Sequence, residues 1–221
     1  VNYTFQNFNL QLTSYQFFTF IGLLIAYFLL QYIIIKFNIM SKIDFDLFYG
    51  ITIAFIFTFS AIFTIVINFI IYSPEAVLNN LHKYSGISSF GGILGFFLSL
   101  IIFTKSKYKV TSFPRIIDSV ILVGFLTMGI GRLGCFTSGC CYGEPTNNFL
   151  NVIYRKHFYA PINLKLIPVQ LYESLFLITI SIIGLLLYLK FYKRVGIIIF
   201  FLYLVFRFFI EFYRFEPEHM K

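Results

Sequence analysis

The chain has 221 residues, of which 59% are hydrophobic, 22% aromatic and 12% charged, and its mean hydropathy is +0.85. A typical soluble domain has roughly 45–50% apolar and about 25% charged residues, so this composition excludes a soluble fold, and the aromatic content excludes a disordered chain. The net charge is +8, but the basic residues lie in short loops between apolar runs, which indicates an integral membrane protein rather than one that binds nucleic acid.

Six apolar runs approach the roughly 20 residues that a membrane-spanning helix needs. In chain order they cover about residues 15–35, 47–72, 87–104, 116–136, 168–189 and 195–213. No repeat or soluble domain interrupts them, so we predict one membrane domain over residues 1–221, an all-α bundle of about six transmembrane helices. No residue before Lys36 is charged, so the first run lacks the basic segment of a cleavable signal peptide and is expected to remain as an anchor.

The basic residues of the short loops predict the orientation. The loops after the first, third and fifth runs contain nine Lys and Arg residues, whereas the N-terminal segment contains none. Because cytoplasmic loops are enriched in Lys and Arg, we expect both termini and the long loop of about residues 137–167 to lie outside the cytoplasm. Polar and turn residues in that loop predict an exposed segment, in which a short helix or strand is possible.

Four charged residues lie inside the predicted spans, namely Arg132, Glu173, Arg207 and Glu211. Charges within a bilayer are costly and usually face a cavity or a partner. Arg207 and Glu211 are four residues apart, so they share one helix face and are expected to pair, and Arg214 continues that face. These four intramembrane charges indicate either a functional site or ion pairs that hold the helices together.

The densest feature of the sequence is the stretch of residues 129–143, which contains five glycines, Arg132 and all three cysteines. Glycine lets the backbone bend and approach a ligand closely, so we predict a glycine-rich broken segment that lines a cavity. Arg132 would present a planar fork of donors there, suited to a phosphate. The alternative is a helix end whose small residues allow tight helix packing.

The cysteines, Cys135, Cys140 and Cys141, leave several interpretations open. A cysteine near a cationic arginine can have a lowered pKa and act as a nucleophile. Cys135 could instead form a disulfide with one of the other two, or the thiols could simply pack. A zinc site would need a fourth ligand and the spacing matches no standard pattern, so neither a metal nor a cofactor is predicted.

Several motifs together resemble the prolipoprotein diacylglyceryl transferase family of bacterial membrane enzymes. Residues 131–143 (GRLGCFTSGCCYG) are similar to the family signature Gly-Arg-x-Gly-Asn-Phe-x-Asn-x-Glu-x-x-Gly. Residues 168–173 (PVQLYE) and 206–214 (FRFFIEFYR) are similar to the family's stretches after the long outer loop and near its end. Residues 89–95 (SFGGILG) fall where the family has Phe-His-Gly-Gly, and Tyr15 falls near a tyrosine that the family needs.

The resemblance implies an enzyme of the bacterial cytoplasmic (inner) membrane. Such an enzyme transfers a diacylglyceryl group from phosphatidylglycerol to the lipobox cysteine of a preprolipoprotein and releases glycerol phosphate. Carried over by position, the resemblance implies catalysis by Arg132, Arg207 and Glu211, and we add Cys140, at the position of the signature glutamate, as a candidate nucleophile. It assigns substrate binding to Tyr15, Gly91, Gly92, Cys135, Ser138, Gly143, Gln170, Tyr172, Glu173 and Arg214.

The chain departs from the family pattern at several positions. Phe90 replaces the family's histidine, Cys135 its signature asparagine and Cys140 its signature glutamate, and the arginine expected late in the second span is missing. The family's seventh span, expected after Arg214, is not among these 221 residues. Because the charge of Arg132 would favour a nearby thiolate, we expect Cys140 to be a nucleophile.

Three functions therefore stay open. The first, which we favour, is a phospholipid-dependent transferase in which Arg132 and Arg207 hold an anionic headgroup. The second is a membrane thiol–disulfide protein that uses the three cysteines, although the sequence has no Cys-x-x-Cys pair. The third is a non-enzymatic lipid-binding protein descended from the enzyme.

The orientation can be tested by cysteine labelling in a variant that lacks the three native cysteines. We expect a single cysteine at position 157 to react with a membrane-impermeant reagent outside intact cells, and one at position 107 to be protected, because basic loops stay in the cytoplasm. Labelling at position 107 but not at position 157 would reverse the predicted orientation.

Overall fold

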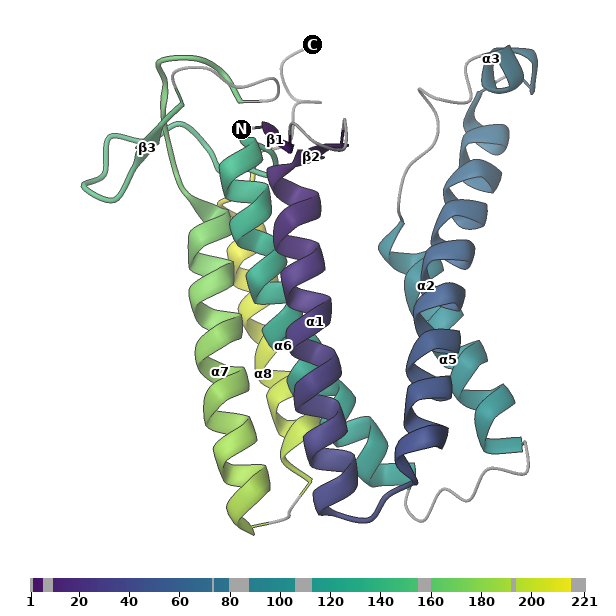
Figure 1. Cartoon of the computed structure of the whole chain (residues 1–221). Helices are drawn as coiled ribbons and strands as arrows, with labels where there is room; N and C mark the ends of the chain where they lie inside the picture. Colours follow the sequence, from purple (N-terminus) through teal and green to yellow (C-terminus); the bar gives the residue numbers. More distant parts are fainter. Residues whose placement is uncertain are drawn as a thin grey trace. The chain divides into compact units, whose positions relative to one another are not determined.

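The computed structural model describes residues 2–5, 10–72, 74–79, 88–105, 113–154, 160–191 and 194–215. In this part of the chain six long helices dominate (Figure 1). They are α1 (Ser14–Lys36), α2 (Lys42–Ile71), α5 (Ser89–Lys105), α6 (Phe113–Ser138), α7 (Val169–Phe191) and α8 (Val195–Glu211). A short helix, α3 (Pro74–Asn79), follows α2. The predicted all-α membrane fold is confirmed, whereas the predicted start of the third span at residue 87 and the labelling sites at 107 and 157 lie outside the described residues.

Four of the described helices are long and apolar enough to cross a membrane: Ser14–Lys36, Lys42–Ile71, Pro114–Ser138 and Val169–Phe191. The other two, α5 and α8, have 17 residues each. At 1.5 Å per residue such a helix is about 26 Å long, a little less than the roughly 30 Å apolar layer of a bilayer. Six crossings therefore stay a prediction.

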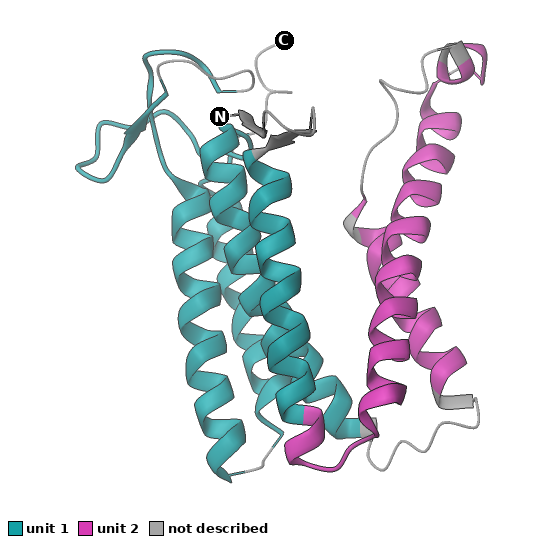
Figure 2. Ribbon diagram, in the orientation of Figure 1, with its two compact units in different colours: residues 1–33, 113–221 teal, residues 34–112 magenta. Residues whose placement is uncertain are grey.

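The chain divides into two compact units, residues 1–33 with 113–221, and residues 34–112 (Figure 2). In the first unit α6 packs against both α7 and α8. Glycines on α6 allow close approach, because a Cβ on Gly129 would lie 2.9 Å from Ile178 on α7, and one on Gly134 would lie 3.0 Å from the Cα of Tyr15 on α1. For residues 129–143 the alternative interpretation was a helix end with small residues that allow tight packing. Gly129 and Gly134 serve this packing role.

The glycine-rich stretch does not break α6 where the sequence predicted. The helix continues through Gly129 and Gly134 and ends only at Ser138. An unbroken helix satisfies its own N–H and C=O groups, which apolar surroundings demand, and the glycines are used for packing instead. The break comes at Gly139, whose φ of +70° lies in the left-handed region that glycine adopts without steric cost.

The end of α6 is a Schellman cap. The N–H of Gly139 donates to the carbonyl of Phe136 at 3.2 Å, and the N–H of Cys140 donates to the carbonyl of Cys135 at 3.1 Å. These are the two bonds that satisfy the last carbonyls of a helix when a left-handed glycine follows it. The cap turns the chain back so that Cys140 lies beside Cys135.

A buried carboxylate of α6 holds the first turn of α8. Asp118 is only 3% exposed, and its carboxylate faces the backbone N–H groups of Gly196 and Ile197. These first-turn N–H groups have no partner within their own helix and carry a partial positive charge, which compensates the buried carboxylate. Only glycine fits at position 196, because a Cβ there would lie 2.7 Å from Oδ1 of Asp118.

The second unit is built on the contact between α2 and α5. Gly91 and Gly95, four residues apart on α5, contact the backbone of α2. A Cβ on Gly91 would collide with the carbonyl oxygen of Phe59, and a Cβ on Gly95 with that of Phe55. This small-xxx-small spacing lets two membrane helices approach closely. The hydroxyls of Thr52 and Ser99 lie 3.1 Å apart across the same contact, so the helices also share a buried polar pair.

Short antiparallel strands organise the segments outside the helices. β1 (Asn2–Phe5) pairs with β2 (Leu10–Thr13) before α1. In the long loop, β3 (Val152–Ile153) pairs with β4 (Lys165–Leu166). Buried residues of the loop, Tyr154, Ala160 and Leu166, form a small core. Of the two possibilities expected for the loop, the described residues show strands.

Replacing Gly95 tests the packing of α5 on α2. Gly95→Ala is expected to lower the free energy of unfolding by about 1–3 kcal/mol, the usual cost of overpacking. Gly50→Ala on α2, where a Cβ meets nothing within 4 Å, is the matched control and should be neutral or stabilising by up to about 1 kcal/mol through helix propensity. Thermal unfolding in detergent gives both values, and equal effects would disprove the close contact.

Candidate functional site

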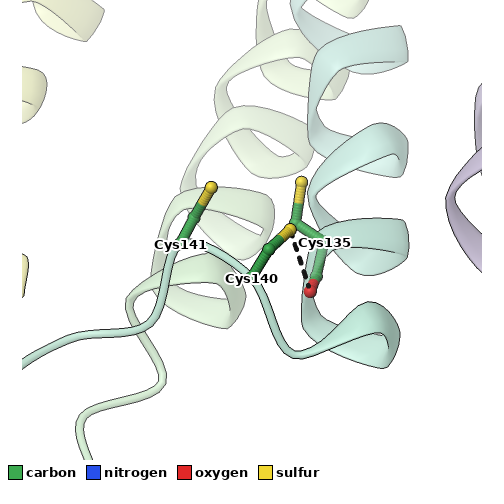
Figure 3. Close-up of side chains that lie close together, drawn as sticks. All are labelled: Cys135, Cys140 and Cys141. Atoms are coloured by element: carbon green, nitrogen blue, oxygen red, sulfur yellow. Dashed lines mark hydrogen bonds between the residues drawn. The ribbon is translucent and has the colours of Figure 1, made fainter. Parts of the chain in front are cut away.

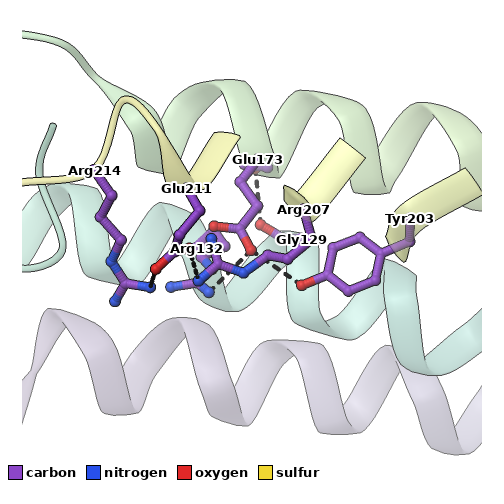
Figure 4. A network of polar contacts seen from close by, with 8 residues as sticks. Gly129, Arg132, Glu173, Tyr203, Arg207, Glu211 and Arg214 are labelled. Carbon is purple, nitrogen blue, oxygen red and sulfur yellow. Dashed lines mark hydrogen bonds and ion pairs between the residues drawn. The ribbon is translucent and has the colours of Figure 1, made fainter. Parts of the chain in front are cut away.

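A partly buried ion pair connects α6 to α7. Nη2 of Arg132 donates to Oε1 of Glu173 at 2.9 Å, and the two side chains are 19% and 2% exposed. The hydroxyl of Tyr203 on α8 donates to the same carboxylate oxygen at 3.2 Å. Glu173 therefore joins three helices through one oxygen atom (Figure 4).

The second half of the network lies on α8. Tyr203, Arg207 and Glu211 follow one another at four-residue spacing and share one face of the helix. Nη2 of Arg207 lies 2.5 Å from Oε2 of Glu211, and Nη1 of Arg214 lies 3.9 Å from Oε1 of the same carboxylate (Figure 4). The ion pair between Arg207 and Glu211, predicted from their spacing, is confirmed.

Each guanidinium keeps a donor that the protein does not use. Among the described residues, Nε of Arg132 and Nη1 of Arg207 are buried nitrogen atoms without a hydrogen-bond partner. An unsatisfied buried donor is costly, about 1–3 kcal/mol and more for a charged group. An anion that reached these nitrogen atoms would satisfy such donors.

Two hollows lie near the end of α8, and charged residues line one of them. A groove of about 470 Å³ on α8 is lined by Arg207 and Glu211 together with Leu204, Phe208 and Phe212. A cavity of about 490 Å³ lies under the long loop, where Asn148, Phe149 and Leu150 face Tyr172 of α7. The first hollow combines an ion pair with apolar walls, which suits a molecule with a charged head and an apolar tail.

Arg214 is held in place by the backbone around it. Residues 142–146 bond on one side to residues 165–167 and on the other to residues 213–215. We call this arrangement the outer ladder. The N–H of Gly143 donates to Ile167 and the N–H of Glu144 donates to Tyr213. Gly143 sits where these segments cross, since a Cβ there would lie 2.6 Å from the carbonyl oxygen of Tyr213, so its role in the structure is packing.

The three cysteines form one cluster at the end of α6 (Figure 3). Their sulfur atoms all lie within 4.8 Å of one another, and all three are free thiols, so the structure holds no disulfide between them. The thiols of Cys135 and Cys140 hydrogen-bond to Cys141 and lower its pKa, and the charges of Arg214 and Arg132 act in the same direction. Hydrogen bonds with Cys135 and with Cys141, together with burial, raise the pKa of Cys140.

This order of pKa values differs from the sequence prediction. Cys140 was expected to be the thiolate because Arg132 would lie close to it, but the structure favours Cys141. The reason is local geometry. The Schellman cap turns Cys140 back beside Cys135. Hydrogen bonds of its thiol with Cys135 and then Cys141, together with burial, raise its pKa.

Gln170 supports the cysteine segment from α7. It is 1% exposed, and its Nε2 donates to the carbonyl of Cys140 at 2.5 Å and to the hydroxyl of Tyr154 at 3.4 Å. The predicted substrate-binding residue therefore holds the backbone after α6. Ser138, another predicted binding residue, is the half-buried last residue of α6.

The remaining predicted residues divide between the two units. Tyr15 belongs to the first unit and lies close enough to Arg132 and Cys135 to interact electrostatically with both. Tyr172 lines the loop cavity, and its hydroxyl donates to the carbonyl of Leu150 at 3.3 Å. Gly91 and Gly92 lie in α5 of the second unit, where Gly91 packs against α2.

Sequence reasoning missed two polar residues of the network. Tyr203 could have been found, because it lies one turn before Arg207 on the charged face of α8. Ser174, whose hydroxyl donates to the carbonyl of Gly129 at 2.8 Å, had no signal of its own, since only the fold brings these positions together.

Helices long enough to cross a bilayer, with a guanidinium–carboxylate network beside an apolar groove, define a polytopic membrane protein with a charged internal site. The sequence pattern of one family, prolipoprotein diacylglyceryl transferase, matches residues 2–221. The chain belongs to this family.

Individual relatives carry the corresponding name. A phosphatidylglycerol–prolipoprotein diacylglyceryl transferase of Clostridium tetani is 36% identical over 107 residues, which is 48% of this chain and 41% of the relative. One of Clostridium perfringens is 31% identical over 138 residues, covering 61% and 52%. One of Rickettsia africae is 33% identical over 162 residues, covering 67% and 59%. The matched region thus spans about half the length of these relatives.

The buried and exposed carboxylates of the network should differ in their contribution to stability. Glu173→Gln leaves Arg132 buried without its counter-charge and is expected to cost about 3–5 kcal/mol of unfolding free energy. Glu211→Gln, at a carboxylate that is 46% exposed, should cost about 0.3–0.5 kcal/mol. Thermal unfolding of the two variants in the same detergent checks the difference, and equal losses would contradict the central position of Glu173.

Proposed function

We propose that this protein transfers a diacylglyceryl group from an anionic phospholipid, phosphatidylglycerol or a close analogue, to a cysteine thiol of a prolipoprotein. The single observation that carries the proposal is the pair of buried, unpartnered guanidinium donors on Arg132 and Arg207. A phosphodiester accepts hydrogen bonds from such donors. The names of the relatives support the choice of donor lipid and acceptor.

The groove on α8 suits the donor lipid. Phe208, Phe212 and Leu204 supply apolar walls for an acyl chain, and Arg207 supplies the charge for the headgroup. The attraction between a guanidinium and a phosphate strengthens as the local dielectric falls. A site surrounded by apolar helices therefore binds the headgroup more strongly than the same residues would in water.

The transfer itself requires stabilisation of a leaving phosphate. The acceptor sulfur bonds to the glyceryl carbon, the carbon–oxygen bond to phosphate breaks, and glycerol phosphate leaves with the electron pair while the thiol proton is released. Preorganised arginines stabilise the charge that develops on the departing oxygen. Glu173 positions Arg132, and Glu211, paired with Arg207 and half-exposed, is the carboxylate available to take the proton.

The acceptor's own cysteine is the attacking group in this scheme. Cys140, the replacement for the family glutamate, has a raised pKa and is a poor nucleophile while protonated. The protein would act in the bacterial inner membrane, with both termini and the long loop on the outer face, as the distribution of Lys and Arg in the loops suggests.

A direct assay uses phosphatidylglycerol labelled in its headgroup and a lipobox peptide. Transfer releases labelled glycerol phosphate and adds the diacylglyceryl group to the peptide cysteine. Complementation of a bacterial strain depleted of its own diacylglyceryl transferase tests the same activity in cells. Binding of the lipid without release of glycerol phosphate would contradict the transferase and support the lipid-binding alternative.

Arg207→Lys should weaken binding of the lipid. A lysine cannot offer two parallel donors to one phosphate, and losing one hydrogen bond to a charged group costs about 1.5–3 kcal/mol, roughly a 10- to 100-fold fall in affinity. Arg194→Lys, at the other end of α8 where the side chain makes no capping hydrogen bond, is the matched control. Titration with phosphatidylglycerol in detergent measures both, and near-normal affinity of Arg207→Lys would exclude bidentate recognition.

A further inference from the structure

We propose that Cys135, Cys140 and Cys141 form a binding site for one thiophilic metal ion, Zn²⁺ or Cu⁺. The three sulfur atoms all lie within 4.8 Å of one another (Figure 3). Cys135 comes from the last turns of α6, and the other two come from the segment that follows the cap. The sequence spacing, Cys-x4-Cys-Cys, matches no standard zinc pattern, so the site is visible only in the fold.

The Schellman cap explains why two of these thiols meet. In this motif the residue after the left-handed glycine bonds back to the helix residue five positions earlier, and their side chains contact each other. Here those two residues are Cys140 and Cys135, joined by a backbone bond of 3.1 Å. The motif normally brings together two apolar side chains, and in this chain it brings together two metal ligands.

The third thiol is placed by an unusual backbone conformation. Cys141 has a φ of +57°, a left-handed conformation that costs a residue with a Cβ about 1–2 kcal/mol. Such a conformation persists only where the surroundings impose it. Gln170 fixes the preceding carbonyl, and the outer ladder fixes Tyr142 through its bond with Phe215. The chain is therefore held on both sides of Cys141.

The sulfur separations are close to those of a metal thiolate site. A Zn–S bond of about 2.3 Å implies S–S distances of roughly 3.8–4.0 Å for tetrahedral or trigonal coordination. The cluster would contract by less than about 1 Å, which side-chain rotation supplies without moving the backbone. Thiolate ligands select soft ions such as Cu⁺ and Zn²⁺ over Mg²⁺ or Ca²⁺.

The coordination set is incomplete for a structural zinc site. Among the described residues no His, Asp, Glu or further Cys joins this group. A Zn²⁺ ion would therefore keep one position for water or another ligand, as catalytic rather than structural zinc sites do. A three-coordinate Cu⁺ would need no fourth ligand. The site does not depend on the proposed transfer reaction and can be tested without it.

Neighbouring charges compensate such a site. Three thiolates with Zn²⁺ carry a net charge of −1, and with Cu⁺ a net charge of −2. Arg132 interacts electrostatically with Cys135 and Cys141, and Arg214 interacts with Cys141. Two guanidinium groups therefore lie where a buried anionic metal–thiolate centre needs positive charge.

The experiment uses the full chain, purified in detergent under anaerobic, reducing conditions and stripped of metal with a chelator. Zn²⁺ and Cu⁺ are titrated in separate arms, and bound metal is measured by elemental analysis after removal of the excess. We expect one ion per chain in at least one arm. Co²⁺ serves as a spectroscopic probe, since sulfur-to-cobalt charge transfer reports thiolate ligation directly.

Single variants identify the ligands. Cys135→Ser, Cys140→Ser and Cys141→Ser should each lower the affinity by more than the roughly 10- to 100-fold that loss of an outer-shell partner costs. Thr137→Ala is the matched control, because its hydroxyl donates to the carbonyl of Gly134 at the same helix end and is not one of the three ligands. Its affinity should match that of the unmodified chain.

Alkylation of the unmodified chain keeps the test independent of whether a variant folds. Bound metal should protect all three thiols from a maleimide, and chelation should restore their reactivity. Fewer than about 0.1 ions per chain with all three thiols reduced would overturn the proposal. So would equal metal binding by the triple serine variant, or purification of the chain with a disulfide among these cysteines and no capacity for metal after reduction.

Discussion

The structure of the first unit depends on the cost of placing an arginine among apolar helices. Arg132 can be there only because Glu173 lies opposite it, and Glu173 in turn accepts a hydrogen bond from Tyr203. Removing either charge would leave the other buried and uncompensated. One carboxylate thus connects α6, α7 and α8, while Arg207, Glu211 and Arg214 form a second set of ion pairs at the end of α8.

The end of α6 shows how the same demand shapes the backbone. A helix in apolar surroundings satisfies its N–H and C=O groups until it leaves the bilayer, so the glycines at 129 and 134 serve packing and the chain turns only at Gly139. Beyond that point the backbone finds new partners in Gln170 and the outer ladder. The cysteines lie at this transition: Cys135 is buried in the last turns of α6, whereas Cys140 and Cys141 are partly buried and follow the helix end.

The features that were predictable from sequence are those with local causes. Apolar runs located all six long helices, and four-residue spacing paired Arg207 with Glu211. The partner of Arg132 is 41 residues away, and the contact of Gly91 with α2 depends on a second helix, so neither followed from spacing. The beginning of α2 at Lys42 was missed because hydropathy ignores a polar first turn, although Ser41 caps it. The order of the thiol pKa values depends on hydrogen bonds among all three cysteines, which the fold brings together.

α8 is tied down at both of its ends. Its first turn faces the carboxylate of Asp118. The residues after its last turn form main-chain hydrogen bonds with residues 142–144. α8 therefore cannot slide along the neighbouring helices, because translation by one turn, about 5.4 Å, would break the contacts at both of its ends. The residues that line the groove beside Arg207 all belong to α8 or directly follow it. A bulky molecule is therefore admitted there by side-chain rearrangement of Phe208 and Phe212 and not by sliding of the helix.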